Sequence, residues 1–146
     1  MTDLGTLGGS YTVGYGINGR GQVTGASYTP DGYDAFLYSN GQMIDLGILP
    51  GGGWVSAGLS INDFGKVAGQ STASAGDFHG FLYENGPMVD LNDLIDPAPG
   101  ITVTSANAIN NTGQITGGYT DSTGTDHAFL YSEGAIIDLG YLGRYL

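Results

Sequence analysis

Two histidines and one aspartate occupy the positions where acid–base or metal chemistry would be sought first. His79 and His127 each stand before a small-Phe-Leu-Tyr segment, and Asp34 takes the same place before the first such segment. Histidine exchanges protons near neutral pH and is the commonest metal ligand. Because equivalent positions of a repeat lie in different units, we expect the two histidines to be apart and to share no metal. We predict that each one hydrogen-bonds to loop backbone at the entry to its strand.

Sequence motifs of known enzyme classes are absent from the chain. It contains no cysteine, which excludes disulfides, thiolate zinc sites and thiol nucleophiles. It has no Gly-x-Ser-x-Gly elbow, no Walker loop and no His-Glu-x-x-His motif. The glycines of segments 5–9 and 51–53 are interpreted as turn residues, since no helix is expected after them. We therefore predict a protein that is not an enzyme and needs no cofactor.

Three polar loops, 29–34, 74–79 and 121–126, are the least regular part of the sequence. Oxygen-rich loops suit Ca²⁺, which takes six to eight hard oxygen ligands. A weak calcium possibility therefore falls on four aspartates: Asp31, Asp34, Asp121 and Asp126. None of the loops has the spacing of an EF-hand, and short acidic loops are commonly only solvated. We predict no metal site.

Aromatic side chains near these loops are the other candidates for ligand contact. Exposed rings stack on sugar faces and anchor protein interfaces, although many rings simply fill the space between sheets. The candidate ligand-binding residues are Tyr33, Asp34, Trp54, Asp77, His79, Asp126 and His127. This set predicts, as an alternative function, a lectin-like carbohydrate-binding module with one weak site per repeat.

The elements that must position these residues come from a threefold repeat. The segment Gly21–Gly25 returns as 65–69 and 113–117, and an Asp-Leu pair starts at Asp3, Asp45, Asp90 and Asp138, so that successive pairs are 42, 45 and 48 residues apart. Periods of this size indicate stacked supersecondary units. We predict one repeat domain, 1–146, with units at about 3–44, 45–89 and 90–137 and a partial copy at 138–146.

Each unit is predicted to form four antiparallel strands. The expected first strands are 11–17, 55–61 and 103–109; the second, 22–27, 66–71 and 114–119; the third contain 36–38, 81–83 and 129–131; the fourth are 43–46, 88–91 and 136–139. Alternation of large and small residues indicates strands, and Asn-x-x-Gly after each first strand indicates a type I turn. Asn-Gly predicts a hairpin before the fourth strand in the first two units. A four-stranded unit of about 45 residues is the size of a propeller blade.

The segment Asp126-His127-Ala128-Phe129-Leu130-Tyr131, with the Asp-Leu-Gly segments and the Gly-Gln-Val turn, resembles the bacterial extracellular repeat family named after its His-Ala-Phe (HAF) motif. The third unit matches best, whereas the second reads His79-Gly80-Phe81 and the first has Asp34 in place of histidine. The resemblance covers nearly the whole chain. It implies propeller-like blades, a secreted or cell-surface bacterial protein, and no known enzymatic activity.

Three blades are too few for a conventional closed propeller, which has four to eight. We expect self-association to complete the blades, for example six from two chains. The alternatives are a closed monomer of the β-trefoil or β-prism type and an open array or filament. The residues predicted to make the contact with another copy are Leu4, Leu7, Tyr141, Leu142 and Tyr145.

The charge of the chain restricts its partners. Three basic residues stand against 14 acidic ones, and the net charge is -11. Nucleic acids and anionic membranes require a positive surface, so we predict neither as a partner, and no apolar run has the roughly 20 residues that span a bilayer. The residues from Met1 lack the pattern of a signal peptide. We expect an extracellular or cell-surface location, with the signal peptide not part of this sequence. The predicted role is structural, self-associating or adhesive.

Overall fold

A computed structural model describes residues 1–95 and 100–140, and in this part of the chain all twelve strands lie in three four-stranded antiparallel sheets. Sheet A contains β1 (Thr12–Ile17), β2 (Val23–Tyr28), β3 (Tyr33–Ser39) and β4 (Gln42–Gly47). Sheet B contains β5 (Ser56–Ile61), β6 (Val67–Thr72), β7 (Phe78–Tyr83) and β8 (Val89–Asp90); sheet C contains β9 (Thr102–Ile109), β10 (Ile115–Thr120), β11 (Asp126–Ser132) and β12 (Ala135–Gly140). Two short 3₁₀ helices, η1 (Ser74–Gly76) and η2 (Leu91–Asp93), stand in the connections. The predicted all-β class and the three four-stranded units are confirmed.

The turns follow the predicted chemistry. The i to i+3 hydrogen bond of the Asn-x-x-Gly turn recurs at Gly21 N to Asn18 O (3.2 Å), at Gly65 N to Asn62 O (3.1 Å) and at Gly113 N to Asn110 O (3.1 Å). The hairpins before β4 and β12 place Asn40 and Glu133 at positive φ, 52° and 50°. Strand order is sequential in every sheet, so each unit is a simple meander with β4, β8 or β12 at one edge.

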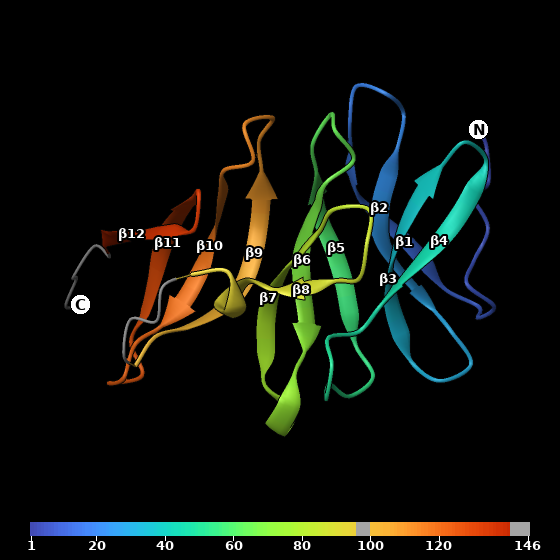
Figure 1. Ribbon diagram of the computed structural model, residues 1–146. Helices are drawn as coiled ribbons and strands as arrows, with labels where there is room; N and C mark the ends of the chain where they lie inside the picture. Colours follow the sequence, from blue (N-terminus) through green and yellow to red (C-terminus); the bar gives the residue numbers. More distant parts are fainter. Residues whose placement is uncertain (96–99, 141–146) are drawn as a thin grey trace, which may run out of the picture.

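The three sheets stack face to face in a row (Figure 1). Strand β5 packs against β1, β2 and β3 of sheet A, and β9 packs against β5, β6 and β7 of sheet B. The described ends of the chain lie at opposite ends of this row. The sheets do not close into a ring, so the β-trefoil and β-prism arrangements are not the ones that this chain adopts.

Two apolar cores fill the spaces between the sheets. The core between sheets A and B includes Leu37, Leu46, Leu49, Val67 and Phe81. The core between sheets B and C is made by Leu82, Leu91, Val103, Ile115 and Phe129, among others. Each sheet contributes its β3-type phenylalanine to one side and its β3-type leucine to the other. Strand β7 of sheet B is therefore covered on both faces, which agrees with its neighbouring large apolar residues Phe81 and Leu82.

The small residues of the first strand of a unit allow the sheets to approach closely. A side-chain Cβ at Gly58 of β5 would overlap the Thr24 hydroxyl of sheet A. At Gly16 of β1 a Cβ would lie 3.3 Å from the Ser60 Cα of sheet B. Glycine at these positions lets one backbone lie directly on the next sheet.

Candidate functional site

A hydrogen-bonded row of asparagines links the three sheets along one side of the stack. Asn18 Nδ2 donates to the backbone oxygen of Asn62 (2.8 Å), and Asn62 Nδ2 donates to the backbone oxygen of Asn110 (3.0 Å). The side chain of Asn110 donates to Gln114 Oε1 of its own turn (2.9 Å), as Asn18 also does to Gln22 Oε1 (2.7 Å). We call these three residues the Asn ladder. The repeated asparagine therefore has a second structural role besides forming its turn, because its side chain also joins successive sheets.

A second row of contacts runs beside the ladder and fixes the turns to each other. Asp63 Oδ1 accepts from Gly19 N (2.7 Å), and Asn111 Oδ1 accepts from Asp63 N (2.8 Å). The bond from Gly19 lowers the pKa of Asp63, with a further contribution from Asn111. The turns of sheets A, B and C are therefore locked in one register.

Each histidine bonds to a carboxylate, a partner that the prediction of a bond to loop backbone did not include. His79 Nδ1 lies 2.6 Å from Asp90 Oδ2, and His127 Nε2 lies 2.8 Å from Asp121 Oδ2. His127 Nδ1 is also 3.6 Å from Asp138 Oδ1. For His79 the partner is the aspartate of the Asp-Leu pair on the neighbouring strand β8, whereas the partner of His127 is Asp121, in the loop between β10 and β11.

Sheet A carries two carboxyl groups where the other sheets carry histidine and aspartate. Asp34 stands in the histidine position and faces Asp45. Burial raises the pKa of Asp34 to about 6, and the negative charge of Asp45, a hydrogen bond to it and the charge of Asp31 add to the effect. Like charges this close favour retention of a proton by one of them. Asp34 therefore titrates closer to neutral pH than an ordinary carboxyl.

The aspartates Asp45, Asp90 and Asp138, which lie beside Asp34, His79 and His127, were not singled out as site residues from the sequence. Each follows the position of Asp34, His79 or His127 by eleven residues. This constant spacing was the available signal, because a repeated pair at one separation across a hairpin indicates a cross-strand contact. A bulge at Ala35/Phe36, repeated at Ala128/Phe129, hides the contact from simple alternation.

Three of the candidate ligand residues, Tyr33, Asp34 and Trp54, lie close together between sheets A and B. A hollow of about 260 Å³ is lined by Asp31, Asp34, Asp45, Trp54 and others. Trp54 is 75 % exposed, and its backbone oxygen accepts from Tyr33 N (2.8 Å). The Tyr33 ring packs against Tyr28 and Tyr11, with centroids 5.1 and 6.1 Å away.

The remaining candidates lie in other sheets and do not form equivalent sites. Asp77 lines a separate hollow of about 330 Å³ with Phe78 and Thr102. Asp126 accepts from Thr120 Oγ1 (2.7 Å). Asp121 accepts bonds from Thr123 and from His127, and these hold its pKa well below the usual range. Among the residues that the structure describes, no group of three or more histidines and acids is arranged to hold a metal ion.

The outward face of sheet C, turned away from sheet B, exposes apolar side chains. Thr116, Leu130 and Ile137 are cross-strand neighbours on β10, β11 and β12. Leu130 and Thr116 border a hollow of about 190 Å³ beside Asn110. Leu139 of β12 is 57 % exposed, whereas its counterparts Leu46 and Leu91 are 8 % and 0 % exposed. We define the outward face of sheet C as Thr116, Ala128, Leu130, Ile137 and Leu139.

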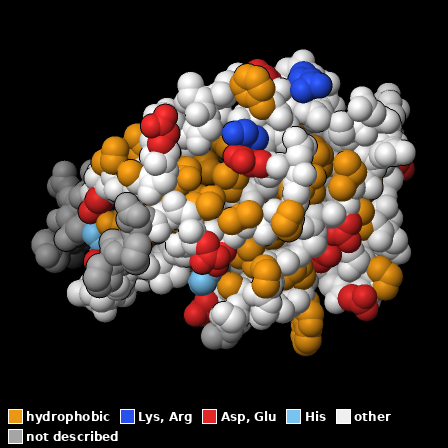
Figure 2. Space-filling view, in the orientation of Figure 1, with side chains coloured by type: hydrophobic (Ala, Val, Ile, Leu, Met, Phe, Trp, Pro, Cys, Tyr) orange, Lys and Arg blue, Asp and Glu red, His pale blue; other side chains and the backbone are white. Residues whose placement is uncertain are grey.

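The surface around these faces is acidic and mixed. Figure 2 shows hydrophobic side chains among acidic ones on the side seen in Figure 1, with lysine and arginine only toward the upper edge. Lys66 Nζ and Glu84 Oε1 form an ion pair at 3.0 Å, with side chains that are 38 % and 49 % exposed. Exposed pairs of this kind contribute little to stability.

The predicted self-association residues are described only in part. Leu4 and Leu7 are half-buried at the N-terminal end, where Leu7 N donates to Ser27 Oγ (2.9 Å). Tyr141, Leu142 and Tyr145 lie outside the described residues. The contact that they were predicted to make stays a prediction.

No family model, curated protein or solved structure matches the chain. Membership of the HAF repeat family therefore stays a prediction from the motif. In the described residues, no helix has the length and apolar character needed to cross a membrane.

The Asp34–Asp45 pair predicts a pH-dependent difference in stability. The pKa of Asp34 is about 6 in the folded chain and about 3.9 when unfolded. The folded chain therefore binds more protons between these values, and native stability falls as pH rises through this window. Asp34→Asn cannot ionise. Its free energy of unfolding should exceed that of the native chain by about 1 kcal/mol above pH 6, allowing for solvent screening, with the gap closing toward pH 4.

Urea unfolding at pH 4, 5, 6 and 7.5 measures this difference. Asp31→Asn is the matched control, because Asp31 is exposed and is the smallest cause of the Asp34 pKa shift. It should give a much smaller gain. A gap that is constant with pH, or that widens toward pH 4, would contradict the role given to Asp34.

Proposed function

We propose that this chain is a structural repeat protein, without catalytic activity, that self-associates by stacking its sheets on those of other copies. The single observation that carries the proposal is the outward face of sheet C. Three of its positions, those of Thr116, Ala128 and Leu139, are buried in sheets A and B and exposed in sheet C. The position of Ile137 is exposed in all three sheets.

The comparison is made at positions that correspond in the repeat. Thr24 of sheet A and Ala68 of sheet B are fully buried beneath the next sheet, and the corresponding Thr116 of sheet C is exposed. The same holds for Leu46 and Leu91 against Leu139. Single exposed apolar residues are normal on a protein surface. A contiguous group of exposed side chains, at positions that a neighbouring sheet covers elsewhere in the chain, supports an interface.

The open end of the Asn ladder supports the same proposal. In each internal step, an asparagine side chain donates to the backbone of the next sheet. Asn18 Nδ2 donates both to Gln22 Oε1 of its own turn and to Asn62 O. Asn110 Nδ2 makes the within-turn bond to Gln114 Oε1 but, in the described part of the chain, has no further sheet to donate to. A further sheet would supply the backbone oxygen that completes the pattern and would fix the register of the contact.

Stacking of this kind is heterologous, because the two surfaces that meet are different. Such contacts give a closed ring when the rotation closes and a fibre when it does not. Two chains would supply six sheets for a ring. A net charge of -11 on each copy opposes association at low ionic strength. We therefore expect stacking to be favoured at physiological salt, where exposed charges are screened.

An extracellular or cell-surface location and an adhesive role are part of the proposal, on the strength of the HAF resemblance. Carbohydrate binding stays a prediction from the sequence. The hollow beside Trp54 offers an exposed ring and carboxylate acceptors, which suit a sugar. Its lining does not recur in the other two sheets, so it supports at most one site and not one per repeat.

Leu139→Asp tests the proposed interface. The side chain is exposed in the single chain, so the fold should tolerate the change, whereas burial of an unpaired charge between sheets is costly. We expect association to weaken at least about tenfold, measured by analytical ultracentrifugation over a range of concentrations. Phe64→Asp is the control, because Phe64 is at least as exposed as Leu139 but lies in a turn of sheet B.

The control should associate like the native chain. Equal association of the native and Leu139→Asp chains would show that the outward face of sheet C is not the contact surface, and the proposal would then lose its main support.

A further inference from the structure

We infer that the N-terminal segment, residues 3–9, is a displaceable cover on the outward face of sheet A, and that the occupant it excludes is sheet C of a second copy. The inference rests on the proposed function and deepens it. The partner copy would use the outward face of sheet C, and the N-terminal segment would weaken the contact by competing for sheet A.

The cover has the sequence and the backbone of an internal connector. Asp3-Leu4-Gly5 corresponds to Asp45-Leu46-Gly47 at the end of β4. Gly5 N donates to Asp3 Oδ1 at 2.9 Å, and Gly47 N donates to Asp45 Oδ1 at 2.8 Å. Both glycines have positive φ, 91° and 76°. The two segments therefore make the same tight turn.

Its attachment to sheet A is also a copy of an internal contact. Leu7 N donates to Ser27 Oγ at 2.9 Å, and Leu49 N donates to Ser71 Oγ at 2.9 Å. Leu49 is buried in the core between sheets A and B. The cover thus lies on sheet A in the way that the connector from sheet A lies on sheet B.

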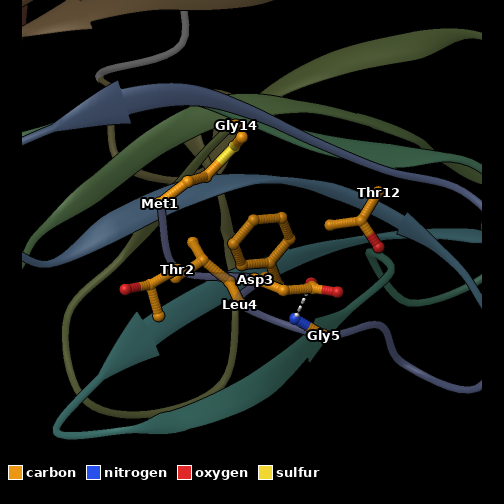
Figure 3. A pocket seen from close by; sticks show the side chains of 8 residues that line it. Met1, Thr2, Asp3, Leu4, Gly5, Thr12 and Gly14 are labelled. Carbon is orange, nitrogen blue, oxygen red and sulfur yellow. Dashed lines mark hydrogen bonds between the residues drawn. The ribbon is translucent and has the colours of Figure 1, made fainter.

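What lies behind the two segments is different. Leu46 is part of sheet A, and its side chain is buried in the core between sheets A and B. Behind Leu4 there is a pocket of about 510 Å³, lined by Met1, Leu4, Thr12, Gly14 and Phe36 among others. Figure 3 shows the side chains of Met1, Leu4 and Thr12 around this space. The cover therefore places leucines on sheet A, as an internal connector does, but no further described sheet stands behind them.

Sheet C of a second copy is the occupant that fits this place. It bears Leu139 in an Asp-Leu-Gly segment of its own, with Gly140 N donating to Asp138 Oδ1 at 2.6 Å and Gly140 at φ 82°. If it stacked on sheet A as sheet A stacks on sheet B, its Leu139 would take the place of Leu4. Both leucines cannot occupy one site, so the cover has to leave.

The Asn ladder would continue across the new contact. Asn62 O accepts Gly65 N within its turn and Asn18 Nδ2 from the preceding sheet. Asn18 O accepts Gly21 N within its turn. Within residues 1–95 and 100–140, no second donor to Asn18 O is found. Asn110 Nδ2 of the docking copy would be that donor.

Removal of the cover is the first test. A chain that lacks residues 2–9 should associate more tightly than the native chain, by about tenfold or more, since a competitor for the face has been deleted. Sedimentation equilibrium at 0.15 M salt gives the association constants. Adding Leu139→Asp to the deleted chain should abolish the gain, because the occupant is sheet C and not a second sheet A.

A milder pair of variants covers the case in which the deleted chain does not fold. Ser27→Ala removes the bond that holds Leu7, worth about 1 kcal/mol, and should tighten association about fivefold. Ser71→Ala removes the matching bond to Leu49 inside the stack. It should lower the stability of the chain without tightening association, so the pair separates release of the cover from general loosening.

The outcomes separate the two proposals. Tighter association in the deleted and Ser27→Ala chains, lost again with Leu139→Asp, supports the cover. Native association that neither variant changes, or that the deletion weakens, overturns the cover and leaves self-association standing. A gain that survives Leu139→Asp overturns sheet C as the occupant. Monomers in every case, at all concentrations, overturn both.

Discussion

A Gly69→Ala chain is expected to lose about 3 kcal/mol of stability. Gly69 closes the repeated Gly-x-Val-x-Gly segment on β6, in the middle of the stack. A Cβ at this position would overlap the carbonyl oxygen of Ala57 and would lie 2.7 and 2.8 Å from two atoms of the Phe81 ring. The Ala57 carbonyl belongs to the paired strand β5 and the ring is buried in the core, so neither can move freely.

Gly86→Ala is the matched control for this prediction. Gly86 lies in the next hairpin of the same sheet, and a Cβ there would meet no atom within 4 Å. We expect a change within about 0.5 kcal/mol. Urea unfolding followed by circular dichroism measures both variants. A Gly69→Ala chain as stable as Gly86→Ala would mean that the close approach of β5 and β6 is not required.

Phe81→Ala should cost about 3–5 kcal/mol, the range for a large aromatic deleted from a core. The Phe81 side chain is 0 % exposed and packs among Leu37, Leu46 and Val67 between sheets A and B. Both walls of this core are sheets that are fixed by the Asn ladder. They can collapse little into the cavity, and the loss should therefore lie at the upper end of the range.

Phe36→Ala is the comparison within the repeat. Phe36 is also buried, but it borders the pocket under residues 1–5 and is covered by a single segment in place of a sheet. That segment can move inward, so we expect a loss of about half that of Phe81→Ala. Thermal and urea unfolding give both values. Equal losses would indicate that the N-terminal cover is as firmly packed as an internal sheet.

The strands and turns could be predicted from the sequence because local chemistry determines them. Asn at the first turn position and glycine at the fourth predict a type I turn, and all three turns have the expected i to i+3 bond. The fourth strand of sheet B is the exception. Strand β8 has two residues, Val89 and Asp90, because Pro87 precedes it and η2 begins at Leu91, where Asp90 accepts from Asn92 N. Capping of this short helix ends the strand early.

The cross-strand contacts of the candidate site could not be predicted in the same way. Pairing of Asp34 with Asp45, and of His79 with Asp90, depends on which residues meet across a hairpin, and the hairpin of sheet A contains a bulge. The meeting of Trp54 with Tyr33 depends on an isolated bridge between two sheets, Tyr33 to Val55. Such contacts are set by how one sheet lies on the next, which alternation within a strand does not encode.

The arrangement of the units was also undetermined by the repeat itself. Three similar units could close around an axis or stack in a row, and local turns are the same in both. What decides is the contact between faces, where the glycines of β1 and β5 let the backbones approach and the Asn ladder holds one register. Among residues 1–95 and 100–140, the same contacts then leave the outward face of sheet C without a sheet on it at one end of the row.

Sedimentation equilibrium of the 146-residue chain at 0.15 M salt, over a wide range of concentrations, tests the central claim most directly. One chain has a mass of 15.0 kDa. Stacking of sheet C on another copy predicts a weight-average mass that rises with concentration toward two or more chains. A constant mass of 15.0 kDa at every concentration would contradict self-association and would show that the exposed face of sheet C receives no second copy.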